Sequence, residues 1–230
     1  MKNITIAIDG YSSTGKSTVA RQLADYLGYV YVDSGAMYRA ITLFAMRNGW
    51  ISEDHFDRQK LIEALPGVAL KFKKENPTTK AEIHLNEENV ERQIRTMEVS
   101  GLVSPVATVS EVRQKLVQLQ RMKMDTGVVM DGRDIGTVVF PDAELKIFMT
   151  ASAQERAQRR YDELIHRGDT ITYQEVLDNV QQRDQIDTTR KDSPLVKASD
   201  AIEIDNSTMN LEDQFHIILQ LAKDRIAGRI

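Results

Sequence analysis

The chain has 230 residues, of which 41% are hydrophobic and 28% are charged, and its formal net charge is −4. These values are typical of a globular protein with a full core, and the negative charge argues against a protein that wraps nucleic acid through a general excess of Lys and Arg. The absence of cysteine excludes disulfides and zinc–thiolate sites. With no signal peptide or membrane span in the sequence, we expect a soluble cytoplasmic monomer that binds neither nucleic acid nor a membrane.

The N-terminal segment predicts a strand, a glycine-containing loop and a helix. Residues 4–8 are a β-branched apolar run, and a helical pattern follows from Ser17 to Gly28. The loop between them, GYSSTGKS, matches the phosphate-binding pattern G-x-x-x-x-G-K-[ST] in the required context. Its backbone N–H groups and the helix N-terminus suit the phosphates of ATP. The predicted ATP contacts are Gly10, Tyr11, Ser12, Ser13, Thr14, Gly15, Lys16, Ser17 and Thr18.

The next part of the chain interrupts an alternation of strands and helices. Residues 29–32 predict a strand, and a helix capped by Ser34 follows as far as Asn48. Residues 68–72 and 81–85 alternate like antiparallel strands around a turn at Asn76-Pro77, which predicts a small inserted sheet. Thr96 begins a short helix, and Thr108 with Glu111 predicts a capping box for a longer helix that reaches Gly127.

The C-terminal part returns to the alternation. Strands are predicted at residues 128–130, 145–149 and 201–204, and a closing helix at residues 211–226. Ser152 and Thr172, each followed three residues later by Glu, predict capping boxes for helices that end near Gly168 and Arg190. The whole pattern predicts an α/β fold with a doubly wound parallel sheet and one small antiparallel insertion.

Two loop residues and two carboxylates have predicted roles around the phosphates. Lys16 is expected to bridge the β- and γ-phosphates, and the Ser17 hydroxyl to ligate Mg²⁺ bound with ATP. Asp131, at the end of a buried strand, can hold that metal through a water or simply form a turn before Gly132. Asp9 either orients a magnesium water or closes a turn.

Arginines near strand ends suggest a second anionic substrate. Arg39 and Arg133 follow neighbouring strands, and a guanidinium matches phosphate geometry well, although either alone could be a solvated surface charge. Arg183, Asp187 and Arg190 project from one helix face, which fits either a binding site or a surface salt-bridge ladder. Arg156, Arg159 and Arg160 lie one helix earlier, so the two basic helices predict a mobile lid.

Five strings carry a family resemblance: IDGYSSTGKST, VDSGAMYRA, DGRDIGTVVFPDAELKIF, ERAQRR and RDQIDTTRKDSPL. The chain resembles the bacterial cytidylate kinases, which belong to the nucleoside monophosphate kinases, along almost its whole length. The resemblance implies transfer of the γ-phosphoryl group of ATP to CMP or dCMP by a single domain spanning residues 1–230. It implies a core at about 1–60, 101–152 and 183–230, a monophosphate-binding insertion at about 61–100 and a lid at about 153–182.

The resemblance also assigns roles to single residues. It implies cytosine contacts by Ser104, Arg113 and Asp134, phosphate contacts by Arg39, Arg133 and Arg190, sugar contacts by Ser34, Arg183 and Asp187, and a monophosphate contact by Ser12. The implied catalytic residues are Lys16, Arg133, Asp131, Arg156 and Arg160. The loop departs from the family at Tyr11, where proline is common, and at Thr14, where a smaller residue is common.

Two other functions fit the loop taken alone. One is a kinase of the same type that acts on a different monophosphate or small metabolite. The other is a nucleotide switch that hydrolyses ATP without an acceptor, although the guanine-reading string N-K-x-D does not occur in the sequence.

Overall fold

The computed structural model describes residues 3–74, 81–122 and 127–229. The chain divides into two compact units. The first combines Met1–Asp33 with Gln120–Ile230, and the second is Ser34–Leu119, which includes the range of the expected insertion. No helix within the described ranges combines the length and the hydropathy needed to cross a membrane.

The first unit is built on a parallel sheet with the strand order β2-β6-β1-β7-β8. The strands are β1 (Thr5–Gly10), β2 (Val30–Asp33), β6 (Val128–Gly132), β7 (Leu145–Thr150) and β8 (Ile202–Asp205). The three central strands, β6, β1 and β7, are almost entirely buried, as apolar runs are in the central strands of a parallel sheet. All five strands were expected from the sequence, within one or two residues at each end.

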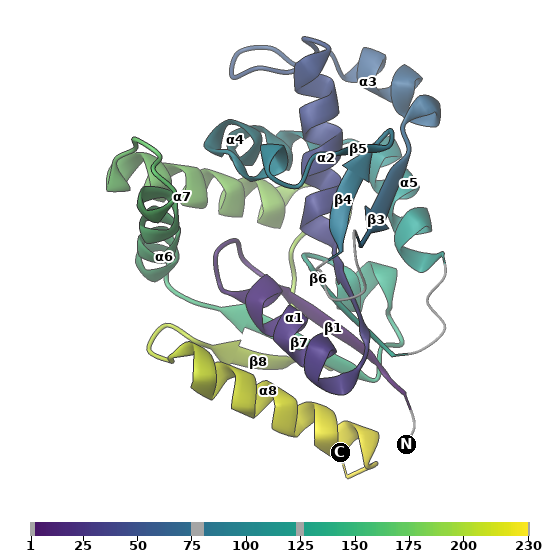
Figure 1. Ribbon diagram of the computed structural model, residues 1–230, viewed down its shortest axis with the longest axis vertical. Helices are drawn as coiled ribbons and strands as arrows, with labels where there is room; N and C mark the ends of the chain where they lie inside the picture. The colour runs from purple at the N-terminus through teal and green to yellow at the C-terminus, as the bar shows by residue number, and fades with distance from the viewer. Residues whose placement is uncertain (1–2, 75–80, 123–126, 230) are drawn as a thin grey trace. The chain divides into compact units, whose positions relative to one another are not determined.

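Four helices accompany this sheet. Helices α1 (Lys16–Leu27) and α8 (Leu211–Ile226) lie side by side against it and bury their apolar faces in one core with β1 and β7 (Figure 1). Helices α6 (Ala153–His166) and α7 (Tyr173–Thr189) pack against each other as a helical hairpin. A short π-helical segment, η3 (Ile135–Val139), follows β6. The carboxyl ends of β1 and β6 therefore lead directly into the loops that carry the predicted site residues.

Helix boundaries follow the predicted capping residues at three points. Thr172 and Glu175 form a reciprocal capping box at the start of α7, and the Ser152 side chain accepts a hydrogen bond from the Glu155 N–H at the start of α6. Thr96 caps the short helix α4 (Met97–Val106) in the same way. These bonds satisfy backbone donors that would otherwise lack partners.

The second unit surrounds its own hydrophobic core. Helix α2 (Ser34–Arg47) packs against α4 and against an antiparallel sheet of β3 (Leu70–Lys73), β4 (Glu82–Leu85) and β5 (Glu88–Asn89). The remaining elements are α3 (Arg58–Ala64), η1 (Leu65–Gly67), η2 (Gln93–Arg95) and α5 (Ser110–Arg121). The predicted inserted sheet is confirmed, whereas α3 and β5 carried too little periodicity to be predicted.

Two predicted helix starts and one helix end are wrong. Helix α2 begins at Ser34 itself, so Ser34 is not its capping residue. The Thr108 hydroxyl donates to the Pro105 carbonyl at 2.7 Å, which ties it to the end of α4 and leaves α5 to begin at Ser110 without that capping box. Helix α5 ends at Arg121, short of Gly127. The predicted turn at Asn76-Pro77 lies outside the described residues.

Candidate active site

The loop at residues 10–17 has the backbone geometry that its glycines predict. Gly10 and Gly15 have φ angles of 145° and 84°, in the region that favours glycine, and Ser13 also has a positive φ of 59°. A Cβ on Gly10 would lie 2.1 Å from the carbonyl oxygen of Met149 on β7, so no larger residue fits there. These reversals bend the chain tightly between β1 and α1, as a phosphate cradle requires.

Lys16 is buried inside this loop. Its Nζ donates to the carbonyl of Tyr11 and, at 3.3 Å, to the hydroxyl of Thr14. Burial holds the pKa of the Lys16 ammonium well below its usual range, and Arg133 lowers the pKa further, against the opposing effect of Asp131 and Asp9. A bound phosphate would add negative charge at this ammonium and favour its protonated form.

Ser17 and Asp131 meet at the start of α1. The Ser17 hydroxyl donates to Asp131 Oδ2 at 2.7 Å, and the Tyr31 hydroxyl donates to the other carboxylate oxygen at 2.8 Å. Burial raises the pKa of Asp131 to about 6, with a further contribution from Asp33. A hydroxyl and a carboxylate beside a phosphate loop are the oxygen donors that Mg²⁺ prefers, so these residues fit a metal bound with a nucleotide.

Asp9 closes a turn. Its two carboxylate oxygens accept hydrogen bonds from the backbone N–H groups of Ile135 and Gly136, at 2.8 and 2.7 Å. It therefore ties the end of β1 to the segment that follows β6. Burial raises the pKa of Asp9 to about 6 despite these two hydrogen bonds.

Asp187 on α7 is the centre of an arginine cluster. Its Oδ2 accepts from Arg133 Nε at 2.9 Å, and its Oδ1 lies 3.7 Å from Arg190 Nη1. Burial raises the pKa of Asp187, but the positive charges of Arg133, Arg183 and Arg190 outweigh burial and leave the pKa below its usual value. Since Arg183, Asp187 and Arg190 are all buried, the alternative of an exposed salt-bridge ladder is wrong.

Arg156 on α6 contacts the loop and the second helix of the hairpin. Its guanidinium forms a forked ion pair with Asp184 on α7, at 3.0 and 2.5 Å, and lies 3.4 Å from the carbonyl of Ser12. The same group stacks 5.0 Å above the ring of Tyr11, which in turn makes an edge contact with Phe148. The side chain of Tyr11 thus has a packing role that the loop pattern does not predict.

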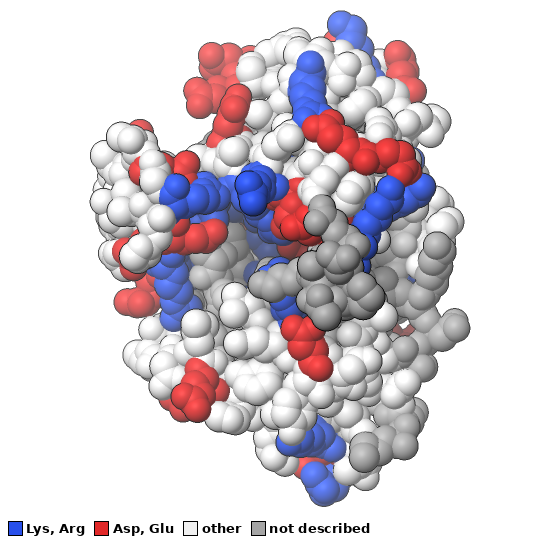
Figure 2. Space-filling view, viewed as in Figure 1, with Lys and Arg blue, Asp and Glu red and all other residues white. Residues whose placement is uncertain are grey.

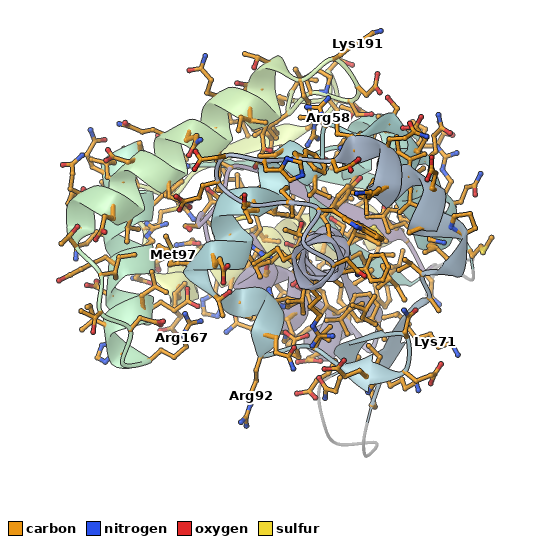
Figure 3. All side chains as sticks on the ribbon, turned by 90° about the horizontal axis from the view of Figure 1, so that it is seen from above. Arg58, Lys71, Arg92, Met97, Arg167 and Lys191 are labelled. Carbon is orange, nitrogen blue, oxygen red and sulfur yellow. The ribbon has the colours of Figure 1, made fainter. Side chains whose placement is uncertain are left out.

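The other two arginines of α6 differ in their surroundings. Arg159 donates to the side chain and to the backbone carbonyl of Asn206, at 3.1 and 2.7 Å, whereas Arg160 pairs with Glu163 on its own helix. On the face shown in Figure 2, Lys and Arg side chains alternate with Asp and Glu over the hairpin. In Figure 3 the labelled Arg167 lies at the end of α6, where it pairs with Asp169.

The expected loop contact Ser12 and the expected base contact Asp134 are also buried in the first unit. Ser12 Oγ has no hydrogen-bond partner among the described residues, as expected for a hydroxyl that binds a ligand. The backbone carbonyl of Asp134 accepts from the N–H groups of Val138 and Val139, which fixes the residue at the start of η3.

The second unit holds the other expected contacts: Ser34, Arg39, Ser104 and Arg113. Ser104 on α4 and Arg113 on α5 are buried, and the Arg113 guanidinium lies 5.5 Å above the ring of Tyr38 on α2. Arg113 Nη1 also donates to the carbonyl of Ala107 at 3.2 Å. Within this unit, helix packing therefore orients a buried guanidinium against an aromatic ring, a stacking arrangement that arginine favours.

Several residues of the site were not predicted from the sequence. Tyr31, Asp184 and Asn206 contact predicted site residues. Tyr31 and Asn206 lie outside the five strings of the resemblance, whereas Asp184 lies within RDQIDTTRKDSPL but had no role assigned.

The first unit combines a parallel sheet, a glycine-rich phosphate loop at the start of α1, a lysine and a hydroxyl in that loop, and buried arginines nearby. Together these features define a P-loop phosphotransferase. A family model described as cytidylate kinase matches residues 6–224, so the chain belongs to the cytidylate kinase family. The chain is 64% identical to the cytidylate kinase of Flavobacterium johnsoniae over 225 residues, which cover 97% of this chain and 98% of the relative.

A second relative, the cytidylate kinase of Flavobacterium psychrophilum, is 62% identical over 225 residues, or 97% of this chain and all of the relative. Among solved structures, an uncharacterised protein from Eubacterium ventriosum matches with a TM-score of 0.50 at 11% identity, covering 97% of this chain and 99% of the other. That match shows a shared fold alone.

Proposed function

We propose that this member of the cytidylate kinase family transfers the γ-phosphoryl group of ATP to CMP or dCMP, giving ADP and CDP or dCDP. The observation that carries the proposal is the placement of Lys16: it is buried inside the loop of residues 10–17, where its Nζ donates to the Tyr11 carbonyl, and burial, Arg133 and Arg183 all lower the pKa of its ammonium. Burying several cations close together costs folding free energy unless bound anions neutralise their charge. A triphosphate and a monophosphate together supply that negative charge.

The proposed contacts are those that the sequence predicts. For ATP they are residues 10–18, with Lys16 at the β- and γ-phosphates. For CMP they are, in the first unit, Ser12, Arg133, Asp134, Arg183, Asp187 and Arg190, and, in the second unit, Ser34, Arg39, Ser104 and Arg113. The orphan hydroxyl of Ser12 and the buried Arg113 support these assignments.

We propose that ATP is used as its Mg²⁺ complex. Ser17 would bind the metal directly and Asp131 through a water, which fits their 2.7 Å hydrogen bond and their all-oxygen chemistry. Bound there, the ion would neutralise charge on the β- and γ-phosphate oxygens.

The reaction needs no general base. An oxygen of the CMP phosphate, which is largely a dianion at neutral pH, attacks the γ-phosphorus, and the bond from this phosphorus to the β–γ bridging oxygen breaks as ADP leaves. Lys16, Arg133 and the α6 arginines Arg156 and Arg160 stabilise the charge on the equatorial oxygens. Arg156 is already held at the loop by its contact with the Ser12 carbonyl.

We propose that residues 153–182, which form most of the α6–α7 hairpin, act as a lid that excludes water from the transfer. Two polar helices joined by a short connection and carrying site arginines support this role. We also propose a cytoplasmic monomer, since nucleotides are cytoplasmic metabolites and one chain supplies every proposed contact.

Replacing Lys16 by alanine tests the proposal. The Lys16→Ala variant should keep its thermal unfolding transition but lose at least a hundredfold in turnover, because one buried charge at a transferring phosphoryl group contributes on the order of 3 kcal/mol. ADP release with CMP as acceptor measures this. A folded Lys16→Ala protein with near-normal turnover would contradict the proposed role of the loop.

A further inference from the structure

Asn206, the residue after β8, lies at a junction between the phosphate loop and the α6 helix. Its side chain has no solvent exposure. The amide nitrogen donates to the carbonyl of Thr14 in the loop and to the Gln214 side chain on α8, both at 2.7 Å. The amide oxygen accepts from Arg159 on α6 at 3.1 Å. All four residues belong to the first unit.

The orientation of this amide is fixed by its neighbours. A backbone carbonyl can only accept a hydrogen bond and a guanidinium can only donate one, so the nitrogen must face Thr14 and the oxygen must face Arg159. The Gln214 oxygen accepts from Asn206, while the Gln214 nitrogen donates to the Met209 carbonyl at 3.1 Å. The network is therefore satisfied in one arrangement, which makes it rigid.

The Thr14 carbonyl determines the direction of the next N–H group. In a planar trans peptide, the C=O of one residue and the N–H of the following residue point in opposite directions. By holding the Thr14 oxygen, Asn206 directs the Gly15 N–H away from itself. Because Gly15 has a positive φ and precedes α1, this N–H is one of the donors expected to bind phosphate.

Asn206 also fixes one arginine of α6. The Arg159 guanidinium bonds to the side-chain oxygen and, at 2.7 Å, to the backbone oxygen of Asn206. The Asn206 backbone is itself anchored, since its N–H donates to the Thr150 carbonyl at the end of β7 at 2.9 Å. One side chain therefore contacts both the loop and the helix that carries the site arginines.

We propose that Asn206 is a positioning residue for ATP: it orients the Thr14–Gly15 peptide of the phosphate loop and joins that loop to α6 through Arg159. The inference rests on the proposed role of residues 10–18 in binding ATP. A positioning role differs from a purely structural role in its effect on binding. Loss of the Asn206 side chain should weaken ATP binding and leave CMP binding unchanged.

Two variants separate the two contacts. In Asn206→Asp, the carboxylate can still accept from Arg159 but faces the Thr14 carbonyl with an oxygen, so the loop contact becomes repulsive. In Asn206→Ala both contacts are lost. We expect the Kd of ATP, measured by calorimetry, to rise roughly tenfold or more in both variants, as for the loss of a buried hydrogen bond. The Kd of CMP should stay within about twofold.

The matched control is Thr42→Val, a conservative change in the second unit. Thr42 is fully buried and its hydroxyl donates to the Tyr38 carbonyl at 2.9 Å, so the change also removes a buried hydrogen bond. It should lower the thermal unfolding midpoint and leave the Kd of ATP unaltered. If the Asn206 variants do not fold, Gln214→Leu, which removes one of the two acceptors of the Asn206 amide, should raise the Kd of ATP about threefold.

The proposal is overturned if the folded Asn206 variants, or the Gln214 variant in their place, bind ATP as the control does, or if the Kd values of ATP and CMP rise together. A failure of the proposed function would give a different experimental result. In that case the unaltered protein would form no ADP in response to CMP, whatever the behaviour of its variants.

Discussion

Arg133 Nε donates to Asp187 Oδ2 at 2.9 Å, joining the loop after β6 to helix α7 through a largely buried ion pair. The two residues are 54 positions apart in the sequence. Asp187 also attracts Arg183 and Arg190, and the Arg190 guanidinium donates in addition to the Ser193 carbonyl at 2.9 and 2.7 Å. Arginines that are already oriented by a protein carboxylate lose less side-chain freedom when they bind a phosphate, which lowers the entropic cost of binding.

Replacing Asp187 by asparagine should therefore affect binding and stability together. Removing one partner of a buried ion pair costs about 3 kcal/mol of unfolding free energy, and the released arginines should raise the KM of CMP at least tenfold. Urea unfolding and steady-state kinetics measure the two effects. Asp178→Asn on the same helix is the control, since Asp178 is exposed and bonds only to Gln174 among the contacts described, and it should change neither quantity.

The ring of Tyr11 should contribute to turnover by placing Arg156. Its contact with Arg156 predicts that Tyr11→Leu lowers turnover about threefold to tenfold, as for the loss of a partly buried cation–π contact. Tyr26→Leu is the control, because Lys223 lies 4.8 Å above the ring of Tyr26 in a comparable but exposed pair. Equal turnover of both variants would show that the Tyr11 ring has no part in placing Arg156.

The metal requirement should depend on Ser17. The Ser17→Ala variant loses the hydroxyl proposed to bind Mg²⁺, so the Mg²⁺ concentration for half-maximal activity should rise about tenfold or more. Titration of activity against Mg²⁺ at fixed ATP measures this. A variant with the same Mg²⁺ dependence as the unaltered protein would remove Ser17 from the metal site.

Asp9 should give the protein a specific dependence on pH. Its pKa is about 6 in the folded protein against an ordinary value of 3.8, so between these values the folded state binds more protons than the unfolded state. The free energy of unfolding attributable to Asp9 therefore falls as pH rises from about 4 to about 6, by about 3 kcal/mol in all.

The Asp9→Asn variant isolates this effect because its amide does not titrate. Urea unfolding of both proteins at pH 4.5 and pH 7 should show the unaltered protein losing stability relative to the variant as pH rises. A difference between the two proteins that stays constant over this range would contradict a raised pKa for Asp9.

The sequence predicts much of this molecule because its signals are local. Loop geometry depends on two glycines only five positions apart, Gly10 and Gly15, and capping residues such as Thr172 act within four positions. The Thr108 capping box failed because the Thr108 hydroxyl lies at the end of the preceding helix, where it donates to the Pro105 carbonyl, a contact that the spacing of Thr108 and Glu111 does not predict. The short strand β5 was missed since two residues cannot show periodicity.

The contacts that shape the site could not be predicted because they join distant positions. Asn206 meets Thr14 across 192 residues, and Arg156 meets the Ser12 carbonyl across 144. Asp9 is similar: its position beside Gly10 fitted both a metal role and a turn, whereas its carboxylate bonds to the backbone of Ile135 and Gly136, 126 and 127 residues away. Such pairs follow from sheet order and helix packing, which no local pattern contains.

We propose that this chain phosphorylates cytidine or deoxycytidine monophosphate at the expense of ATP. The most direct test measures ADP release with CMP, dCMP, UMP, AMP or GMP as acceptor, and with no acceptor. We predict the highest kcat/KM with CMP or dCMP and negligible ADP release without an acceptor. Fastest turnover with AMP or GMP, or ATP hydrolysis that is equally fast without CMP, would contradict the claim.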